Sequence, residues 1–208
     1  MRAGRLALPV VCLVVFALLA WQVLTAGPVV RLDLQVTEYL AVRRQDWLTV
    51  FMLGVANGHD SVVVLGAAVL LALWRVKRRQ LQDLAMLAVV PTGMLLNVGL
   101  KHLFERPRPV LEEPLVHLST FSFPSGHAVA STVFYGALCV LVFVHARGVV
   151  TRTLAALAAA AMVLLVTFSR IYLGAHYLSD VVAGVCVGVL CVLAFRMLLL
   201  SELDAERP

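Results

Sequence analysis

The chain has 208 residues, of which 62% are hydrophobic and only 14% are charged, and its formal net charge is +5. An ordinary soluble domain has about 45 to 50% apolar and about 25% charged residues, so the composition excludes that class and indicates an integral membrane protein. The basic residues lie between apolar runs and not on one interleaved face, which argues against nucleic-acid binding.

Six apolar runs approach the length that a helix needs to cross a bilayer, which is about 20 residues. In chain order they cover residues 6–25, 61–75, 82–103, 127–146, 153–168 and 180–200. The second and fifth runs are short, and the segment from Leu48 to Val55 either lengthens the second run or forms a helix in the membrane interface. The pattern predicts an all-α, polytopic membrane protein, a six-transmembrane-helix bundle that forms one domain over residues 1–208.

The first run also fits a secretory signal, because Arg2 and Arg5 precede it and small residues follow it, but its length favours a retained helix. If the N-terminus is cytoplasmic, ten Lys and Arg residues fall on the inner side and seven on the outer side. The inner side then holds a compact basic cluster at residues 75–79, in agreement with the positive-inside rule. We therefore expect a multi-pass protein of the plasma (inner) membrane with both termini in the cytoplasm. In the last run, Gly184 and Gly188 are spaced for close helix packing.

Three polar clusters fall on the predicted outer side, at residues 101–109, 124–127 and 169–180. Each alone has a structural explanation: interfacial anchoring for the cations of the first, including Arg106, a helix cap for the second, and a helical i,i+4 pair for the third. Together they bring cations and histidines from three segments to one membrane face. Because ionisable groups near hydrocarbon are costly and usually functional, this convergence indicates an anion-binding site.

The cations suit phosphoryl transfer, in which negative charge spreads over three phosphoryl oxygens. Lys101, Arg108 and Arg170 are the candidates for holding these oxygens, and an arginine can grip two at once. Ser125 is expected to cap the fourth span with its side chain. Gly126 lets the backbone approach closely, so that the first N–H groups of this helix can bind an anion.

Two histidines fit the two ends of an in-line displacement. His176 is the candidate nucleophile, with Asp180 holding its other ring nitrogen in the required tautomer. His127 is the candidate acid that protonates the leaving oxygen and later activates water. This mechanism passes through a phosphohistidine and requires neither a metal nor another cofactor. The stretch from Asn57 to Asp60 is expected to be a polar turn before the second span, with a minor metal or substrate contact as the alternative.

These motifs resemble the signature of the type 2 phosphatidic acid phosphatase superfamily. That signature is a Lys, six residues and Arg-Pro; then Pro-Ser-Gly-His; then Ser-Arg, five residues, His, three residues and Asp. The positions that match it are Lys101, Arg108 and Pro109; Pro124 to His127; and Ser169, Arg170, His176 and Asp180. The resemblance implies a six-helix lipid phosphatase whose site lies at the outer membrane face, with the same roles for the histidines and the three cations.

The chain is most similar to the compact bacterial members, which act on undecaprenyl pyrophosphate, phosphatidylglycerol phosphate or phosphatidic acid. Undecaprenyl pyrophosphate is the first expectation, because an outward-facing site is where the spent cell-wall carrier is released. The other two lipids are the alternatives. A vanadate-dependent haloperoxidase, a phosphatase of soluble sugar phosphates and a non-hydrolytic lipid or anion carrier are further alternatives. The expected partners are the bilayer and its lipid phosphate, and no oligomeric state is indicated.

Overall fold

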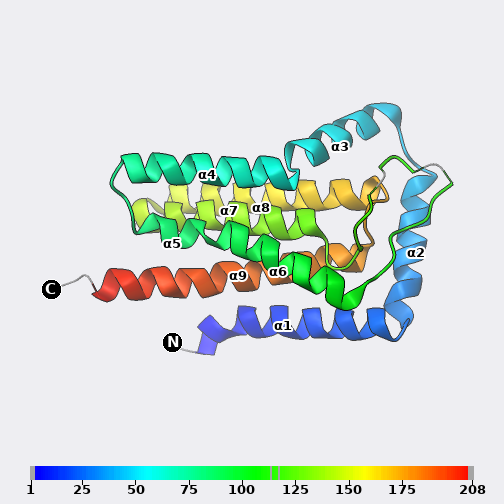
Figure 1. Cartoon of the computed structure of the whole chain (residues 1–208), viewed down its shortest axis with the longest axis horizontal. Helices are drawn as coiled ribbons and strands as arrows, with labels where there is room; N and C mark the ends of the chain where they lie inside the picture. Colours follow the sequence, from blue (N-terminus) through cyan, green and yellow to red (C-terminus); the bar gives the residue numbers. More distant parts are fainter. Residues whose placement is uncertain (1–2, 113, 117, 206–208) are drawn as a thin grey trace.

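The computed structural model describes residues 3–112, 114–116 and 118–205. All regular structure in this part of the chain is helical (Figure 1). The helices are α1 Ala3–Leu24, α2 Pro28–Ala41, α3 Asp46–Gly58, α4 Ser61–Lys77, α5 Asp83–Leu87, α6 Val89–Phe104, α7 Gly126–His145, α8 Val149–Tyr172 and α9 Leu178–Ala205.

Five segments of the described residues are long and apolar enough to cross a membrane, and a bent pair raises the number to six. The five are Leu6–Leu24, Asp83–Phe104, Gly126–His145, Val149–Tyr172 and Leu178–Leu198. The bent pair is α3 with α4, which meet at 48°. The predicted all-α, multi-pass architecture is thus confirmed. The fifth span is longer than predicted, because Arg152 and Arg170 lie inside α8 and interrupt the apolar run from which its ends were read.

Helix α7 lies at the centre of the bundle, where α4, α6, α8 and α9 all pack against it. Two glycines of α9 allow one of these approaches. A Cβ atom on Gly184 would lie 2.7 Å from the carbonyl oxygen of Ser125, and one on Gly188 would lie 2.5 Å from Thr132 Cβ. The predicted close-packing role of this glycine pair is confirmed, and the contact brings the start of α7 against α9.

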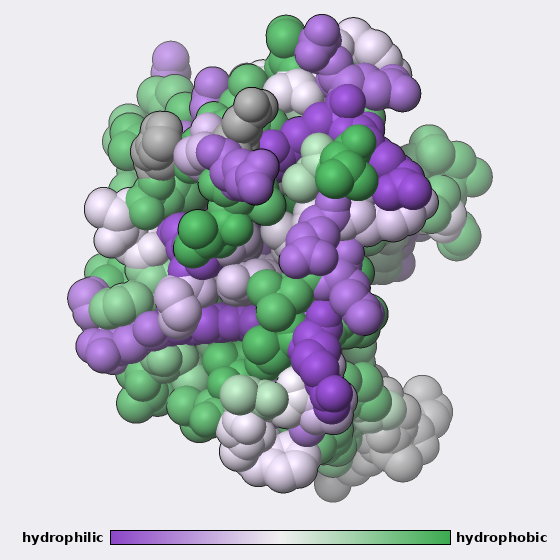
Figure 2. All heavy atoms as spheres, turned by 90° about the vertical axis from the view of Figure 1, so that its right-hand side faces the viewer, coloured by the Kyte–Doolittle hydropathy of each residue, from purple (hydrophilic) through white to green (hydrophobic). Residues whose placement is uncertain are grey.

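The N-terminal end of α1, the C-terminal end of α9 and the α4–α5 connection lie at one end of the bundle, and α2 crosses the other end (Figure 1). Helix α2 begins with Pro28 directly after its N-cap, Gly27, a position where the fixed φ of proline suits a helix start. The helix was not predicted, because 14 residues with a mixed polar pattern do not resemble a span. Its buried side carries Asp33 and Thr37. Hydrophilic side chains gather on this end of the molecule, seen face-on in Figure 2.

Candidate active site

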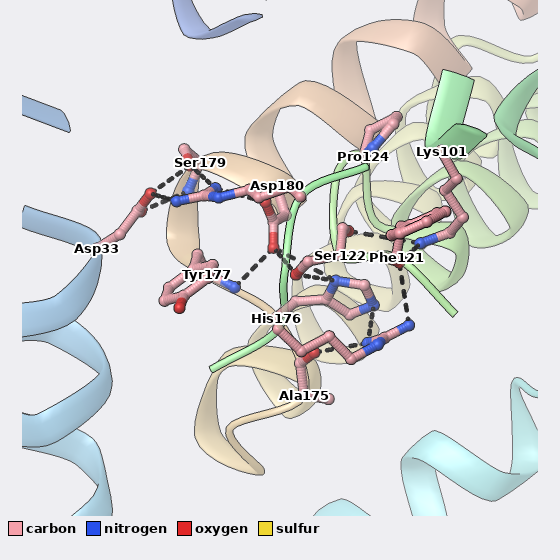
Figure 3. Close-up of polar contacts among 12 residues, drawn as sticks. Asp33, Lys101, Phe121, Ser122, Pro124, Ala175, His176, Tyr177, Ser179 and Asp180 are labelled. Atoms are coloured by element: carbon pink, nitrogen blue, oxygen red, sulfur yellow. Dashed lines mark hydrogen bonds and ion pairs between the residues drawn. The ribbon is translucent and has the colours of Figure 1, made fainter. Parts of the chain in front are cut away.

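A histidine–aspartate pair lies at the turn between α8 and α9. His176 is 2% exposed, and Asp180, in the first turn of α9, is completely buried. The Nδ1 atom of His176 lies 3.5 Å from Asp180 Oδ2, and Figure 3 shows the two side chains facing each other. Gly174 forms the turn with a φ of +70°, which side chains with a Cβ rarely adopt. The predicted pairing of these two residues is therefore present.

Two further donors hold the Asp180 carboxylate from the side of His176. Asp180 Oδ2 accepts hydrogen bonds from the backbone N–H of Tyr177, at 2.9 Å, and from the hydroxyl of Ser122. Ser122 was not predicted as a site residue. A single serine in a loop forms no pattern that indicates a function. The sequence shows only that Ser122 lies three residues before Ser125, next to the second motif.

The environment of His176 favours the neutral imidazole. Burial lowers the pKa of His176 to about 3; the hydrogen bond and charge of Asp180 oppose this shift, and the cations of Arg108 and Lys101 add to it. Since Nδ1 faces an acceptor, Asp180, the neutral ring carries its proton there and its lone pair on Nε2. This is the tautomer that a nucleophilic histidine needs.

Arg108 and Lys101 both extend to the loop before α7. Arg108 Nη1 lies 3.2 Å from His176 Nε2 and donates to the carbonyl oxygen of Ala175 at 2.7 Å. Its Nε donates to the Thr120 carbonyl at 2.6 Å, and burial lowers the pKa of Arg108 from its ordinary value. Lys101 Nζ donates to the carbonyl oxygen of Phe121. The two predicted cations thus lie beside the imidazole.

Arg170 and the start of α7 supply buried polar atoms to the site. Arg170 is 3% exposed and interacts electrostatically with Lys101 and Arg108. Its Nε and the hydroxyl of Ser125 are buried without a hydrogen-bond partner within the described residues. The side-chain capping expected of Ser125 is wrong: the residue occupies the N-cap position, but its hydroxyl accepts no helix N–H. Its backbone N–H instead donates to the Asp180 carbonyl at 2.9 Å, which joins the second motif to the third.

Gly126 opens α7 in a narrow space. A Cβ atom there would lie 3.3 Å from Asn97 Oδ1 and 3.9 Å from Lys101 Cε. Asn97 also donates from Nδ2 to the Pro124 carbonyl at 3.2 Å, which ties this loop to α6. A side chain at Gly126 would therefore crowd Asn97 and approach Lys101, one of the predicted cations.

His127 points toward α3. Its Nε2 lies 3.2 Å from the carbonyl oxygen of Ala56, so this ring nitrogen must carry a proton. His127 interacts electrostatically with Asp60 and with Arg170, one of the three predicted phosphate-binding cations. His176 instead contacts Arg108, Ser122 and Asp180.

Asn57 and Gly58 are the last residues of α3, and His59 and Asp60 form the bend before α4, so the predicted polar turn is present but shorter than expected. Asp60 caps α4 by accepting from the Val62 N–H at 3.0 Å. His59 uses both ring nitrogens, at 2.8 Å from the Val55 carbonyl and 2.6 Å from the Tyr135 hydroxyl. Among the described residues, no group of three or more His, Cys, Asp or Glu side chains is arranged to hold a metal ion.

Arg106 is buried, and its interpretation as an interfacial anchor is wrong. Its exposed fraction is 6%, and it pairs with Asp180 Oδ1 at 2.6 Å and with Asp33 Oδ2 at 2.8 Å. Neither Asp33 nor the role of Arg106 was predicted. The two residues are 73 positions apart, and no local spacing relates them.

Together these contacts place a neutral imidazole nitrogen beside fixed cations and unpartnered donors. The sequence profile of the PAP2 superfamily matches residues 82–201. The chain belongs to the PAP2 superfamily. It is a multi-pass membrane protein and a lipid phosphatase, as the signature in residues 101–180 predicts.

Similarity to individual proteins agrees with this assignment and extends beyond residues 82–201. Phosphatidylglycerophosphatase B of Bacillus subtilis (strain 168) is 33% identical over 187 residues, covering 86% of this chain and 89% of that protein. The crystal structure of a transmembrane PAP2 type phosphatidylglycerolphosphate phosphatase from Bacillus subtilis matches with a TM-score of 0.83 at 30% identity, covering 96% of this chain and 97% of that one. The structure of LpxE from Aquifex aeolicus has a TM-score of 0.60 at 23% identity, over 79% of this chain and 94% of that one, and shares the fold.

Proposed function

We propose that this protein hydrolyses phosphatidylglycerol phosphate to phosphatidylglycerol and inorganic phosphate. The observation that carries the proposal is the similarity, over nearly the whole length of both chains, to a protein named for this reaction. Undecaprenyl pyrophosphate, the first expectation from the sequence, has no such support, and phosphatidylglycerol phosphate replaces it as the favoured substrate. Phosphatidic acid has the same kind of phosphate monoester and stays a competitor.

In the proposed mechanism, His176 Nε2 attacks phosphorus while the bond from phosphorus to the glycerol oxygen breaks. Protonated His127 gives the proton of its Nδ1 atom to that oxygen while its Nε2–H stays on the Ala56 carbonyl, and Asp180 stabilises the charge that develops on the His176 ring. Water then attacks the phosphohistidine, losing its proton to His127, and inorganic phosphate leaves with His176 restored. Each step balances without a metal or another cofactor.

Lys101, Arg108 and Arg170 are proposed to hold the phosphoryl oxygens, with Ser125 and the N–H group of Gly126 as further donors. Arg170 Nε and Ser125 Oγ support this role, because a buried donor without a partner is costly unless a ligand satisfies it. Arg108 Nη1 contacts the Nε2 lone pair of His176, so the incoming phosphate must take over this hydrogen bond before attack.

The site is proposed to lie at the outer face of the membrane, with both termini in the cytoplasm. The basic cluster of residues 75–79 ends α4, at the end of the bundle opposite α2 (Figure 1). Under the positive-inside rule that end is cytoplasmic, and the opposite end, which holds His176, is outer.

The decisive assay measures phosphate release by the detergent-purified protein from three lipids in parallel: phosphatidylglycerol phosphate, phosphatidic acid and undecaprenyl pyrophosphate. We expect the first to have the highest kcat/KM and the His176→Ala variant to release no phosphate from any of them. A higher kcat/KM for undecaprenyl pyrophosphate would refute the substrate assignment. Phosphate release that His176→Ala leaves intact would refute the mechanism, and lipid transport without hydrolysis would favour the carrier alternative.

A further inference from the structure

A buried ionic network lies behind the His176–Asp180 pair, on the side away from the imidazole. It joins Asp33 of α2 and Arg106 of the α6–α7 loop to Ser179 and Asp180 at the start of α9. Asp33 is 1% exposed, Arg106 6%, Ser179 3% and Asp180 0%. Figure 3 shows Asp33 reaching from α2 toward Ser179, with Asp180 beyond it. Buried charges of this kind are costly, and their retention needs an explanation.

Arg106 connects the two carboxylates through its planar fork. Its Nη1 donates to Asp180 Oδ1 at 2.6 Å and to Ser179 Oγ at 2.8 Å, and its Nη2 donates to Asp33 Oδ2 at 2.8 Å. The guanidinium carbon also lies 4.1 Å from the centre of the Tyr177 ring. The direction of this guanidinium is therefore set from several sides.

The contacts divide the two oxygens of Asp180 between two tasks. Oδ1 is held by Arg106, whereas Oδ2 faces His176 Nδ1 at 3.5 Å and accepts from Ser122 and the Tyr177 N–H. A carboxylate held in this way cannot turn about its own axis. It keeps one oxygen directed at the ring nitrogen that must carry the proton for Nε2 to act as a nucleophile.

Asp33 anchors the far side of the network. Its Oδ1 accepts from the Ser179 N–H at 2.9 Å, and its Oδ2 accepts from the Ser179 hydroxyl and from Arg106. It therefore fixes both the guanidinium and the first turn of α9, in which Asp180 lies. Asp33 is outside the matched PAP2 region, residues 82–201, so α2 contributes to the site from a separate part of the chain.

We propose that Asp33 and Arg106 are positioning residues for the nucleophile: they orient Asp180, which in turn orients His176. The inference rests on the proposed roles of His176 and Asp180. Neither positioning residue touches substrate in this scheme. Their loss should weaken transition-state stabilisation and leave ground-state phosphate binding nearly unchanged.

The test compares Asp33→Asn with Glu38→Gln, a matched control that removes one negative charge from an exposed position on the same helix. In Asp33→Asn one of the two accepting oxygens becomes an NH2 group. This group either faces the guanidinium of Arg106 or replaces the oxygen that accepts from the Ser179 N–H. We expect kcat to fall by about 10- to 100-fold with KM within about twofold of wild type, because orientation and not binding is impaired. Glu38→Gln should keep wild-type kcat.

Two inhibitors distinguish positioning from general destabilisation. Vanadate adopts the five-coordinate geometry of the transition state against the nucleophile, whereas inorganic phosphate resembles the ground state. In Asp33→Asn the inhibition constant for vanadate should rise about as much as kcat falls, and that for phosphate should stay within about twofold. Arg106→Lys keeps the charge but not the fork, so it should retain more activity than Arg106→Gln.

Thermal unfolding in detergent gives the folded fraction of each variant, and Ser179→Ala replaces Asp33→Asn if the latter does not fold. The proposal is overturned if Asp33→Asn has the same kcat per folded molecule as Glu38→Gln, or if the inhibition constants for vanadate and phosphate rise by the same factor. The network would then stabilise the fold without orienting the nucleophile. The wild-type protein is assayed alongside. If it hydrolyses no lipid phosphate, the proposed function fails; if it does and Asp33→Asn matches the control, this inference alone fails.

Discussion

Replacing Gly184 by Ala should separate the start of α7 from α9 and so loosen the link between two of the three motifs. The added Cβ atom would lie 2.7 Å from the Ser125 carbonyl oxygen and 2.8 Å from Ala128 Cβ. The first neighbour is backbone, so relief requires the two helices to move apart by about half an ångström. That movement stretches the hydrogen bond from the Ser125 N–H to the Asp180 carbonyl, now 2.9 Å.

Overpacking of this kind costs about 1 to 3 kcal/mol, which corresponds to a fall in Tm of about 2 to 12 °C for a chain of this size. Because a misplacement of about 1 Å can cost about 100-fold in rate, half of that should lower kcat by roughly tenfold. The matched control is Gly99→Ala on the exposed side of α6, where an added Cβ meets nothing within 4 Å. The control should leave kcat unchanged and, since alanine favours helix, should not lower Tm.

The assay measures Tm in detergent and phosphate release from phosphatidylglycerol phosphate on the same preparations. A Gly184→Ala protein that equals Gly99→Ala in both measurements would refute the inference that this helix contact sets the geometry of the site.

Three further perturbations test the site. Asp180→Asn should lower kcat by about 1,000-fold or more, because an amide no longer selects the Nδ1–H tautomer of His176; activity close to wild type would contradict that role. Arg108→Lys should lower kcat/KM by about 100-fold, since an ammonium cannot grip two phosphoryl oxygens, and an unchanged kcat/KM would show that Arg108 does not bind phosphate. The depressed pKa of His176, about 3, keeps its ring neutral in the fold, whereas the unfolded ring takes up a proton below about pH 6.5. His176 therefore lowers stability as the pH falls from about 7 to about 5, and His176→Gln should show a smaller fall in Tm over that range; an equal fall would contradict the depressed pKa.

The spans were predictable because a bilayer imposes a length and an apolar composition that a sequence displays directly. Helix α2 was not predictable, because it crosses the end of the bundle and needs neither the length nor the apolar composition of a membrane span. Helix α3 was seen in part, in the segment from Leu48 to Val55, but its 48° bend against α4 depends on packing that the sequence pattern does not express.

The residues proposed to act directly were also predictable, because each motif keeps its members within a few positions of one another. Their supporting residues were not. Arg106 lies inside the first motif but at no signature position, and Ser122 lies in the loop before the second. Both contact Asp180 only after the α6–α7 loop folds back onto α9. Asp33 meets Arg106 across 73 positions. The absence of a side-chain cap at Ser125 was not predictable for the same reason. The position of this residue depends on a tertiary contact, the hydrogen bond from its backbone N–H to the Asp180 carbonyl.

The central claim, attack by His176 on phosphorus, is tested most directly by trapping the intermediate. The protein is mixed with lipid labelled in its terminal phosphate, quenched in alkali, which preserves phosphohistidine, and mapped by mass spectrometry. The label should appear on His176, be absent from His176→Ala, and accumulate in a His127 variant that breaks the intermediate down slowly. Label on any other residue, or full turnover by the His176→Ala variant, would contradict the mechanism.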